Sequence, residues 1–248
     1  MVLFFLSAGM LHASKQGEIV LLTSADNQPY EFIRGGVIVG FDIDLAKAIA
    51  ERLGKKLIIK DMPFASIIPS LVTKQGDFAM AAITPTGAKR ENVDFSVDYQ
   101  SNVSAIVFAN GDDFAYMQNR NAVFPLALLA GRTVGVQLGT HHETDILTAD
   151  IPNLTIRRYD NIGAMVAEIL NSASGNGNLY ALVIGVAEAR ILVGKNPKLC
   201  YFPLKFSDSF AVALPRGSPH KAEINRIIEF FKESGKISDL EIKWDINR

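Results

Sequence analysis

The sequence predicts an α/β fold built from two lobes, each a mostly parallel sheet flanked by helices. Short apolar, strand-like segments alternate with amphipathic helical segments, which is typical of parallel strands joined by helical crossovers. A comparable alternation begins again at residues 133–137, which indicates a second lobe. The 248 residues, 48% of them hydrophobic, are enough for one large or two small domains with a substantial core.

Residues 40–54 form the first complete helical pattern. Asp42 is the expected N-cap, and Gly54 offers a C-terminal cap. Between them the apolar positions recur at helical spacing, namely Leu45, Ala46, Ile49, Ala50 and Leu53. A strand-like run at 56–60 follows at once, so this segment predicts a helical crossover between neighbouring parallel strands.

The rest of the first lobe follows the same alternation. A helix is expected at 66–75, with Pro69 in its first turn and Gly76 at its end. Residues 26–29 are a loop rich in turn residues, and residues 110–113 a turn. Strands are expected at 19–24, 77–83 and 103–108.

The second half repeats the pattern and then returns to helices. Helical stretches are expected after Thr140 and at 162–170, and residues 171–178 form a polar loop that lacks the flanking elements of a dinucleotide fingerprint. A strong helix follows Ser218 as its cap and ends at Gly235, and a short helix covers 238–244. Strands are expected at 133–137, 154–157, 179–184, 199–204 and 210–214.

Composition and motifs exclude several function classes. The formal net charge of −1 shows no basic excess, so nucleic acid is not expected as a partner. Cys200, the only cysteine, lies in an apolar run and is expected to be a buried small hydrophobe. We find no GxSxG elbow, HExxH pair or P-loop, and we expect no cofactor and no metal.

The N-terminus has the character of a targeting segment. Residues 2–11 are apolar and small residues follow them, so residues 1–14 are predicted to be a signal peptide. No Lys or Arg precedes the apolar run, which leaves open a truncated start or a buried first element. No Cys follows the run, so a lipid anchor is not expected, and no later segment has the roughly twenty apolar residues of a membrane span.

Seven segments, taken in order, resemble one family over residues 19–244. They are YEF at 30–32, GFDIDLAKAIAERLG at 40–54, PFASIIPSL at 63–71, ITPT at 83–86, VDFS at 93–96, GRTVGVQLGT at 131–140 and ESGKISDLEIKWD at 233–245. The chain is similar to the periplasmic solute-binding proteins of polar amino-acid ABC transporters, family 3 of the extracellular solute-binding proteins.

The resemblance implies a periplasmic-binding-protein-like fold with two hinge strands. Lobe one would take residues 18–106 plus 210–248 and lobe two 107–209, with hinges near 103–108 and 203–210. It also implies a secreted, periplasmic, monomeric receptor that closes around a small polar amino acid and delivers it to the membrane permease of an ABC transporter.

The resemblance places the ligand carboxylate near the turn at 82–90. Ala82, Thr84 and Thr86 are candidate contacts there, followed by Lys89 and Arg90 where the family has an arginine. Counting back from VDFS puts Lys89 in that slot. We favour Arg90 because a guanidinium grips a carboxylate with two parallel donors, and a pair of solvated surface cations is the alternative.

Aromatic residues are expected to form part of the pocket. The resemblance implies that Phe64 lies against the ligand side chain, whereas Asn27 stands where a second aromatic is usual. Tyr30 and Phe41 are expected to belong to the core.

Lobe two contributes the helix that opens at Thr140, whose free amides would complete the anion site. His141 is either a ligand contact or a solvated residue, and a joint metal site with His142 is not expected because adjacent helical residues point in different directions.

The family's usual ammonium-binding Asp is replaced here by Gly185. Glu188, three residues later, either reaches the site or complements its helix N-terminus. Asp26 and Asp208 are further acidic candidates.

The sequence therefore predicts a non-enzymatic receptor. The acids favour a basic amino acid, and cystine or a neutral polar amino acid stays open. A cyclohexadienyl dehydratase-like enzyme on the same fold is the alternative, which needs a positioned general acid, with Glu188 the best candidate. A sensor domain is a third possibility.

Overall fold

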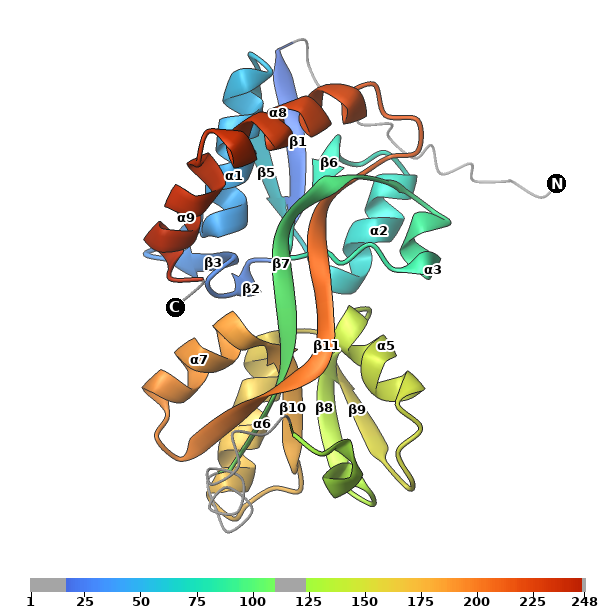
Figure 1. Ribbon diagram of the computed structural model, residues 1–248, viewed down its shortest axis with the longest axis vertical. Helices are drawn as coiled ribbons and strands as arrows, with labels where there is room; N and C mark the ends of the chain where they lie inside the picture. Colours follow the sequence, from blue (N-terminus) through green and yellow to red (C-terminus); the bar gives the residue numbers. More distant parts are fainter. Residues whose placement is uncertain (1–16, 110–123, 247–248) are drawn as a thin grey trace, which may run out of the picture.

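The computed structural model describes residues 17–109 and 124–246, arranged as two lobes (Figure 1). Two long strands, β7 (Asp94–Ala109) and β11 (Leu199–Leu214), run through both lobes and connect them. The expected signal peptide and the expected turn at 110–113 lie outside the described residues. Within the described residues, no helix has both the length and the apolar character needed to cross a membrane.

The strands of both lobes belong to one hydrogen-bonded sheet in the order β5-β1-β6-β11-β7-β10-β8-β9. In lobe one, β1 pairs in parallel with β5 and β6, and in lobe two β8 pairs in parallel with β9 and β10. The antiparallel pair β7 and β11 lies between these two parallel sets. Its register shifts between Pro203 and Ser207, within the segment expected to contain a hinge.

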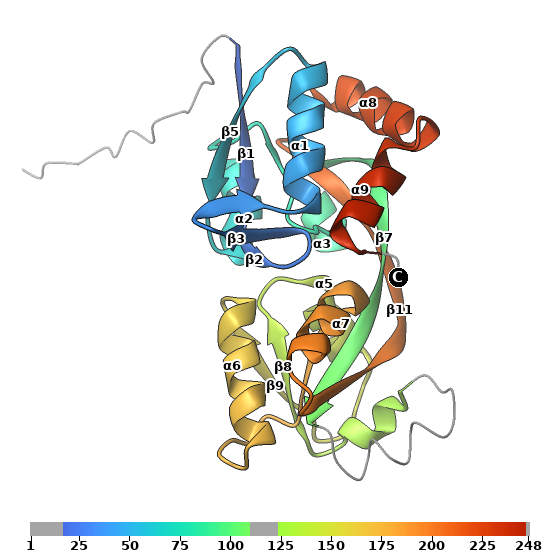
Figure 2. The same ribbon diagram turned by 90° about the vertical axis from the view of Figure 1, so that its left-hand side faces the viewer.

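Lobe one is a sheet with helices on both faces, plus a small three-stranded sheet. In Figure 2 the small sheet, β2–β3–β4, lies on the side of lobe one that faces lobe two. The elements are β1 (Glu18–Thr23), β2 (Asp26–Asn27), β3 (Glu31–Arg34), β4 (Val37–Val39), α1 (Phe41–Arg52), β5 (Lys56–Asp61), α2 (Phe64–Val72), β6 (Phe78–Ala79), α3 (Gly87–Arg90), α8 (Lys221–Glu233) and α9 (Lys236–Trp244).

Lobe two repeats the layered arrangement with fewer elements. They are the 3-10 helix η1 (Leu126–Leu129), β8 (Thr133–Gln137), α5 (His141–Thr148), β9 (Thr155–Tyr159), α6 (Ile162–Ala173), β10 (Ala181–Gly185) and α7 (Val186–Lys195).

The core consists of four apolar clusters, one on each face of the sheet in each lobe. In lobe one, residues of α1, α8 and α9 cover one face and residues of α2 the other. In lobe two, residues of α6 and α7 cover one face, and η1 and α5 the other. Cys200 is buried, as predicted. Tyr30 and Phe41 are also core residues, as predicted, and their rings meet edge to face 6.2 Å apart.

Helix α1 begins differently from the prediction. Gly40, not Asp42, is the N-cap, at φ 139° and ψ 177°. A Cβ at Gly40 would lie 2.0 Å from the carbonyl oxygen of Tyr30, so only glycine fits this close approach. Gly54 follows the helix in the left-handed conformation at φ 65°, consistent with its expected role as a cap.

Several other boundaries also differ. Helix α2 begins at Phe64, so Pro69 lies inside the helix rather than in its first turn. The expected strand at 77–83 shortens to β6 because the chain turns at Ala82, which has φ 48°. Helix α8 begins at Lys221 with His220 as N-cap, so Ser218 is not its cap. The segments expected at 199–204 and 210–214 form one strand, β11.

Candidate functional site

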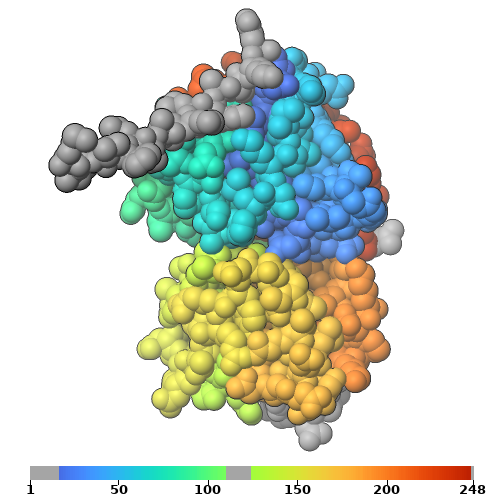
Figure 3. Space-filling view, turned by 180° about the vertical axis from the view of Figure 1, so that it is seen from behind, coloured from blue at the N-terminus to red at the C-terminus, as the bar shows by residue number. Residues whose placement is uncertain are grey.

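A pocket lies between the two lobes, with about 470 Å³ of space free of protein atoms, the part open to solvent included. In the space-filling view the surfaces of the two lobes meet along one boundary (Figure 3). Lobe one contributes Asp26, Asn27, Glu31, Phe64 and Ala82 to its wall. Lobe two contributes Gln137, Thr140, His141, His142 and Glu188. Most of these residues lie at the ends of strands or the starts of helices, which is where open α/β sheets bind ligands.

Asp42 holds the wall of lobe one in place. It lies in the first turn of α1, is fully buried, and its Oδ2 accepts hydrogen bonds from the Ala82 amide at 2.7 Å and the Tyr99 hydroxyl at 2.8 Å. Ala82 has a positive φ, which is uncommon for a residue with a side chain. The carboxylate therefore fixes the strained turn that shapes the pocket.

Three carboxyl groups gather at and behind the pocket without a cationic partner. One carboxyl oxygen of each, namely Glu31 Oε2, Asp42 Oδ1 and Glu188 Oε2, is buried and accepts no hydrogen bond. Within the described residues, the ion pairs that form include none of these three carboxylates. The pocket therefore presents negative charge, or acid protons, with nothing in the protein to balance it.

Burial raises the pKa of each of these acids. It raises the pKa of Glu188 to about 7 and that of Asp42 to about 6. The pKa of Glu31 is raised well above its ordinary value, first by burial and then by the neighbouring Asp42 charge. Asn27 lies beside Glu31 and Glu188 and lowers the pKa of both by a smaller amount.

Glu188 occupies the space next to Gly185. It lies in the first turn of α7, which begins directly after β10, and it is buried. A Cβ placed on Gly185 would lie 2.3 Å from Glu188 Oε2 and 2.7 Å from Asn102 Oδ1. Glu188 therefore lies both in the pocket wall and in the first turn of α7, a position compatible with either of its two predicted roles.

Asp26 connects the two lobes. Its Oδ2 accepts a hydrogen bond from the Ile162 amide of α6 at 2.9 Å and a longer one from Gln137 Nε2 at 3.4 Å. Burial raises the pKa of Asp26, and the Ile162 hydrogen bond opposes that rise. These contacts require the closed arrangement of the lobes.

His141 and His142 are both buried, so the expectation of a solvated histidine is wrong. His141 Nδ1 lies 3.0 Å from Thr84 Oγ1 of lobe one, and His142 Nδ1 lies 3.0 Å from Ser104 Oγ. Burial lowers the pKa of His141 to about 3 and holds that of His142 well below its ordinary value. Both imidazoles are therefore neutral at physiological pH.

The two rings also lie together, with centroids 3.8 Å apart, so the argument that they point in different directions is wrong. With Asp145 they form a group whose ligand atoms lie within 4.8 Å of one another. Lys89 places positive charge near both histidines, which opposes the binding of a cation at this group.

Lys89, not Arg90, points toward the cleft, which reverses our preference. Lys89 Nζ donates to the Thr84 carbonyl at 3.3 Å and lies 5.7 Å from the centre of the Phe64 ring. Burial lowers its pKa to about 8. Arg90 is exposed, and its Nε donates to the Pro85 carbonyl. The two residues are consecutive in α3 and so point about 100° apart.

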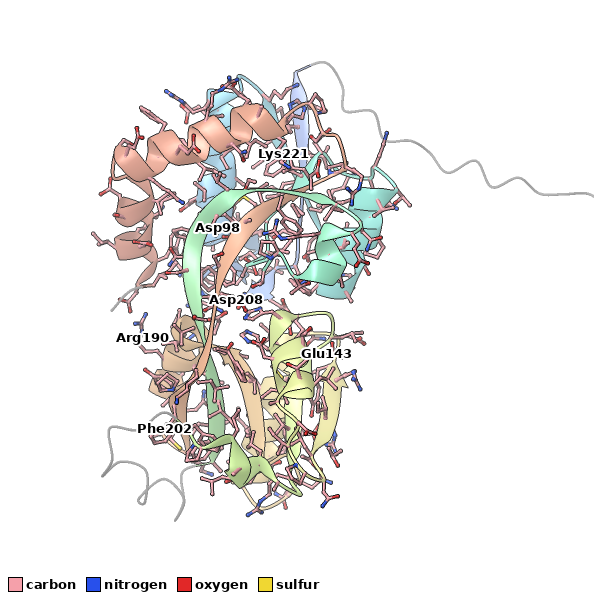
Figure 4. All side chains as sticks on the ribbon, turned by 45° about the vertical axis from the view of Figure 1, so that its right-hand side comes forward. Asp98, Glu143, Arg190, Phe202, Asp208 and Lys221 are labelled. Carbon is pink, nitrogen blue, oxygen red and sulfur yellow. The ribbon has the colours of Figure 1, made fainter. Side chains whose placement is uncertain are left out.

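Of the remaining predicted site residues, Phe64 lines the pocket, whereas Thr86 and Asp208 do not. Phe64 begins α2, and Thr86 is the N-cap of α3. Figure 4 places Asp208 on β11 between the lobes, while Asp98 lies on β7 beside lobe one. Asp208 Oδ2 is 4.0 Å from His141 Nε2, and the charge of Lys89 lowers the Asp208 pKa against a larger rise from burial.

Several pocket residues were not predicted from the sequence, among them the polar side chains of Glu31, Gln137 and His142. Glu31 stands between two aromatics in a strand, and a charged residue in such an apolar run is a signal of a buried functional group. Gln137 is the last residue of parallel strand β8, the strand end at which ligand groups are usual.

Comparison with known proteins gives consistent matches. The model of the bacterial extracellular solute-binding proteins, family 3, matches residues 19–247. The arginine-binding extracellular protein ArtP of Bacillus subtilis is 28% identical, covering 93% of this chain and 87% of ArtP.

Two solved structures are also similar. An ancestral arginine-binding protein bound to arginine has 33% identity and a TM-score of 0.82, covering 92% of this chain and 98% of that one. A mutant of ArgBP from T. maritima has 34% identity and a TM-score of 0.80, covering 92% and 95%.

Proposed function

Because the chain belongs to the bacterial extracellular solute-binding proteins of family 3, we propose that it is the amino-acid-binding component of an ABC transporter and that it binds a basic amino acid, arginine first. The family consists of solute-binding proteins, so the dehydratase-like alternative is set aside. The proposed location is extracytoplasmic, the compartment in which extracellular and periplasmic relatives of this family act.

The buried, unpaired carboxyl groups are the observation that carries this proposal. A basic amino acid has two cationic groups, and two acids of the pocket wall, Glu31 and Glu188, each have a buried carboxyl oxygen without a hydrogen-bond donor. A buried acid without a partner is costly, and a cationic ligand removes that cost by pairing with it. A neutral amino acid would leave more of these oxygens unpaired. The names of ArtP and of the ancestral arginine-binding protein support the same ligand.

Polar groups beside the acids suit the ligand carboxylate. Thr140 lines the pocket. Thr84 is not among the lining residues, but it contacts the lining residue His141 and binds Lys89. Thr84, Lys89 and the N-terminus of α5 at Thr140 supply a hydroxyl, a positive charge and helix amides. The proposed ligand therefore lies with its carboxylate toward these groups and its cations toward the acids. It contacts both lobes, so its binding stabilises the closed state, which the transporter's permease would then recognise.

Thermal unfolding against a panel of amino acids tests the proposal. At a ligand concentration of 100 Kd, binding adds about 2.7 kcal/mol of stability, which raises the melting temperature of a protein this size by about 5 to 10 °C. We expect arginine to give the largest rise, followed by other basic amino acids, with glutamine and cystine well below. A larger rise with a neutral amino acid than with every basic one would contradict the proposed ligand.

A further inference from the structure

We propose that Glu188 and Gly185 act as one unit, in which Gly185 leaves the space that the Glu188 carboxyl fills, and that this carboxyl gives up a proton when it binds the ligand's cation. The inference rests on the proposed function, because it concerns how the same pocket receives a basic amino acid. It assigns Gly185 a role in ligand recognition and makes binding release protons.

The first step is the shared space. A Cβ on Gly185 would lie 2.3 Å from Glu188 Oε2 and 2.9 Å from Glu188 Cδ, closer than any side chain tolerates. The backbone of Gly185 does not itself require glycine, since its φ is −72°. Glycine therefore leaves open the space that the Glu188 carboxyl occupies, and a side chain at this position would displace that carboxyl.

The second step is that one oxygen of this carboxyl, Oε2, has no hydrogen-bond donor in the described residues, although Asn27 lies beside the carboxyl. Glu188 lines the pocket, and its Oε2 is buried. Arg190, on the same helix, donates to the carbonyl oxygens of Asp245 and Ile246. A donor supplied by the ligand would complete the bonding of Oε2.

The third step is the charge of the surroundings, which come from four elements and from Tyr30, the residue before β3. The groups around Glu188 and the pocket are Asp26 and Asn27 from β2, Tyr30, Glu31 from β3, Asp42 from α1, and His141 and His142 from α5. Both histidines are neutral because burial lowers their pKa, and the charge of Lys89 acts on these histidines and on Asp208 rather than on Glu188.

The empty pocket consequently favours the protonated form of Glu188, whose pKa is about 7 instead of the ordinary 4.5. A bound cation favours the carboxylate and moves the pKa back down. Between these values the free protein carries a proton that the complex lacks, so binding releases it. The Kd therefore rises as pH falls below about 7, by up to about tenfold per pH unit.

Calorimetric titration of the full chain with arginine tests this. Titrations at pH 6 in two buffers of different ionisation enthalpy count the protons, and we expect at least one released per arginine bound. Glu188→Gln is nearly isosteric and is expected to lower the release by about one proton per arginine and to weaken binding at pH 7.5 by about 30-fold or more. Asp145→Asn is the matched control: the pKa of Asp145 is also raised, to about 6, but Asp145 does not line the pocket, so the release should persist.

A pair of double variants tests the shared space. Gly185→Asp with Glu188→Ala moves the acid by three residues into the vacated room, and Gly185→Ala with Glu188→Ala leaves no acid. We expect the first to bind arginine at least tenfold more tightly than the second, with circular dichroism confirming that both are folded.

The outcomes separate the two proposals. If wild-type protein binds no basic amino acid, the proposed function fails, and this inference fails with it. If arginine binds but Glu188→Gln keeps both the affinity and the proton release, the inference is overturned and the proposed function stands. Equal affinities of the two double variants would overturn the exchange of space between Gly185 and Glu188.

Discussion

The two lobes differ in how each holds its side of the pocket. Lobe one fixes its wall from within: Asp42 binds the Ala82 amide and the Tyr99 hydroxyl, all inside the same lobe. Lobe two instead depends on contacts with lobe one: His141 is hydrogen-bonded to Thr84, and the Ile162 amide donates to Asp26. The turn at Ala82 in lobe one is therefore preformed, whereas His141 and the Ile162 amide of lobe two find these partners only on closure.

This difference suggests a division of labour. The preformed wall of lobe one binds the ligand at low entropic cost. The wall of lobe two forms its contacts with lobe one on closure, so a ligand in the pocket, or a proton on a group of that wall, changes the balance between the open and closed states. Substitutions in lobe one should change global stability or initial binding. Substitutions in lobe two should change the balance between open and closed states.

The largest expected effect is on the preformed wall. Asp42→Ala leaves two buried donors without an acceptor and should lower the free energy of unfolding by about 3 kcal/mol. Asp44→Ala is the control: Asp44 contacts Lys243 and Trp244 at the partly exposed face of the same helix, so its loss should cost about 1 kcal/mol or less. Urea unfolding measures both. Equal losses would show that lobe one does not depend on its internal network.

A smaller effect is expected at the cation of lobe one. Lys89→Ala should weaken arginine binding by about tenfold to hundredfold, because it removes a charge-assisted contact to the ligand carboxylate. Arg90→Ala, one residue away on the exposed side of α3, should change the Kd by less than about threefold. Calorimetry measures both constants. The reverse order would restore Arg90 as the carboxylate ligand.

The smallest effect is a pH dependence of closure in the unliganded protein. The pKa of His141 is about 3 in the closed state because of burial, and opening returns it toward the ordinary 6.5. The open state then binds the proton, so closure is unaffected above pH 6.5 and weakens below it, by up to about tenfold per pH unit. Small-angle scattering at pH 7.5 and 5 follows the closed fraction.

His141→Gln should remove most of this pH dependence. His220→Gln, a substitution at the N-cap of α8, far from the pocket lining, should leave it unchanged. A closed fraction that rises on acidification would contradict the dependence of lobe two on its neutral histidines.

Local patterns predicted the scaffold well because each depends on neighbouring residues alone. The apolar stripe and the terminal Gly54 located α1, since both act within one helix. Asp42 was misassigned as a cap because its carboxylate is bound by Ala82 and Tyr99, which are distant in sequence. Short-range patterns carry no information about such partners.

The site was less predictable for the same physical reason. The choice between Lys89 and Arg90 depends on how α3 is oriented about its axis, since that orientation decides which side chain faces the cleft. The number of donors on a guanidinium, on which the preference for Arg90 rested, says nothing about this orientation. The burial of His141 depends on Thr84 across the cleft. Glu188 was recognised as a candidate, but its relation to Gly185 is visible only in three dimensions.

The central claim is that the pocket between the lobes binds a cationic amino acid through acids that have no partner in the protein. Calorimetry of the wild-type chain with L-arginine and with L-citrulline, which has nearly the same shape but an uncharged side chain, tests it most directly. At pH 7.5 we expect arginine to bind about 30-fold or more tightly than citrulline, since citrulline leaves a buried acid unpaired. Equal affinities, or tighter binding of citrulline, would contradict the account.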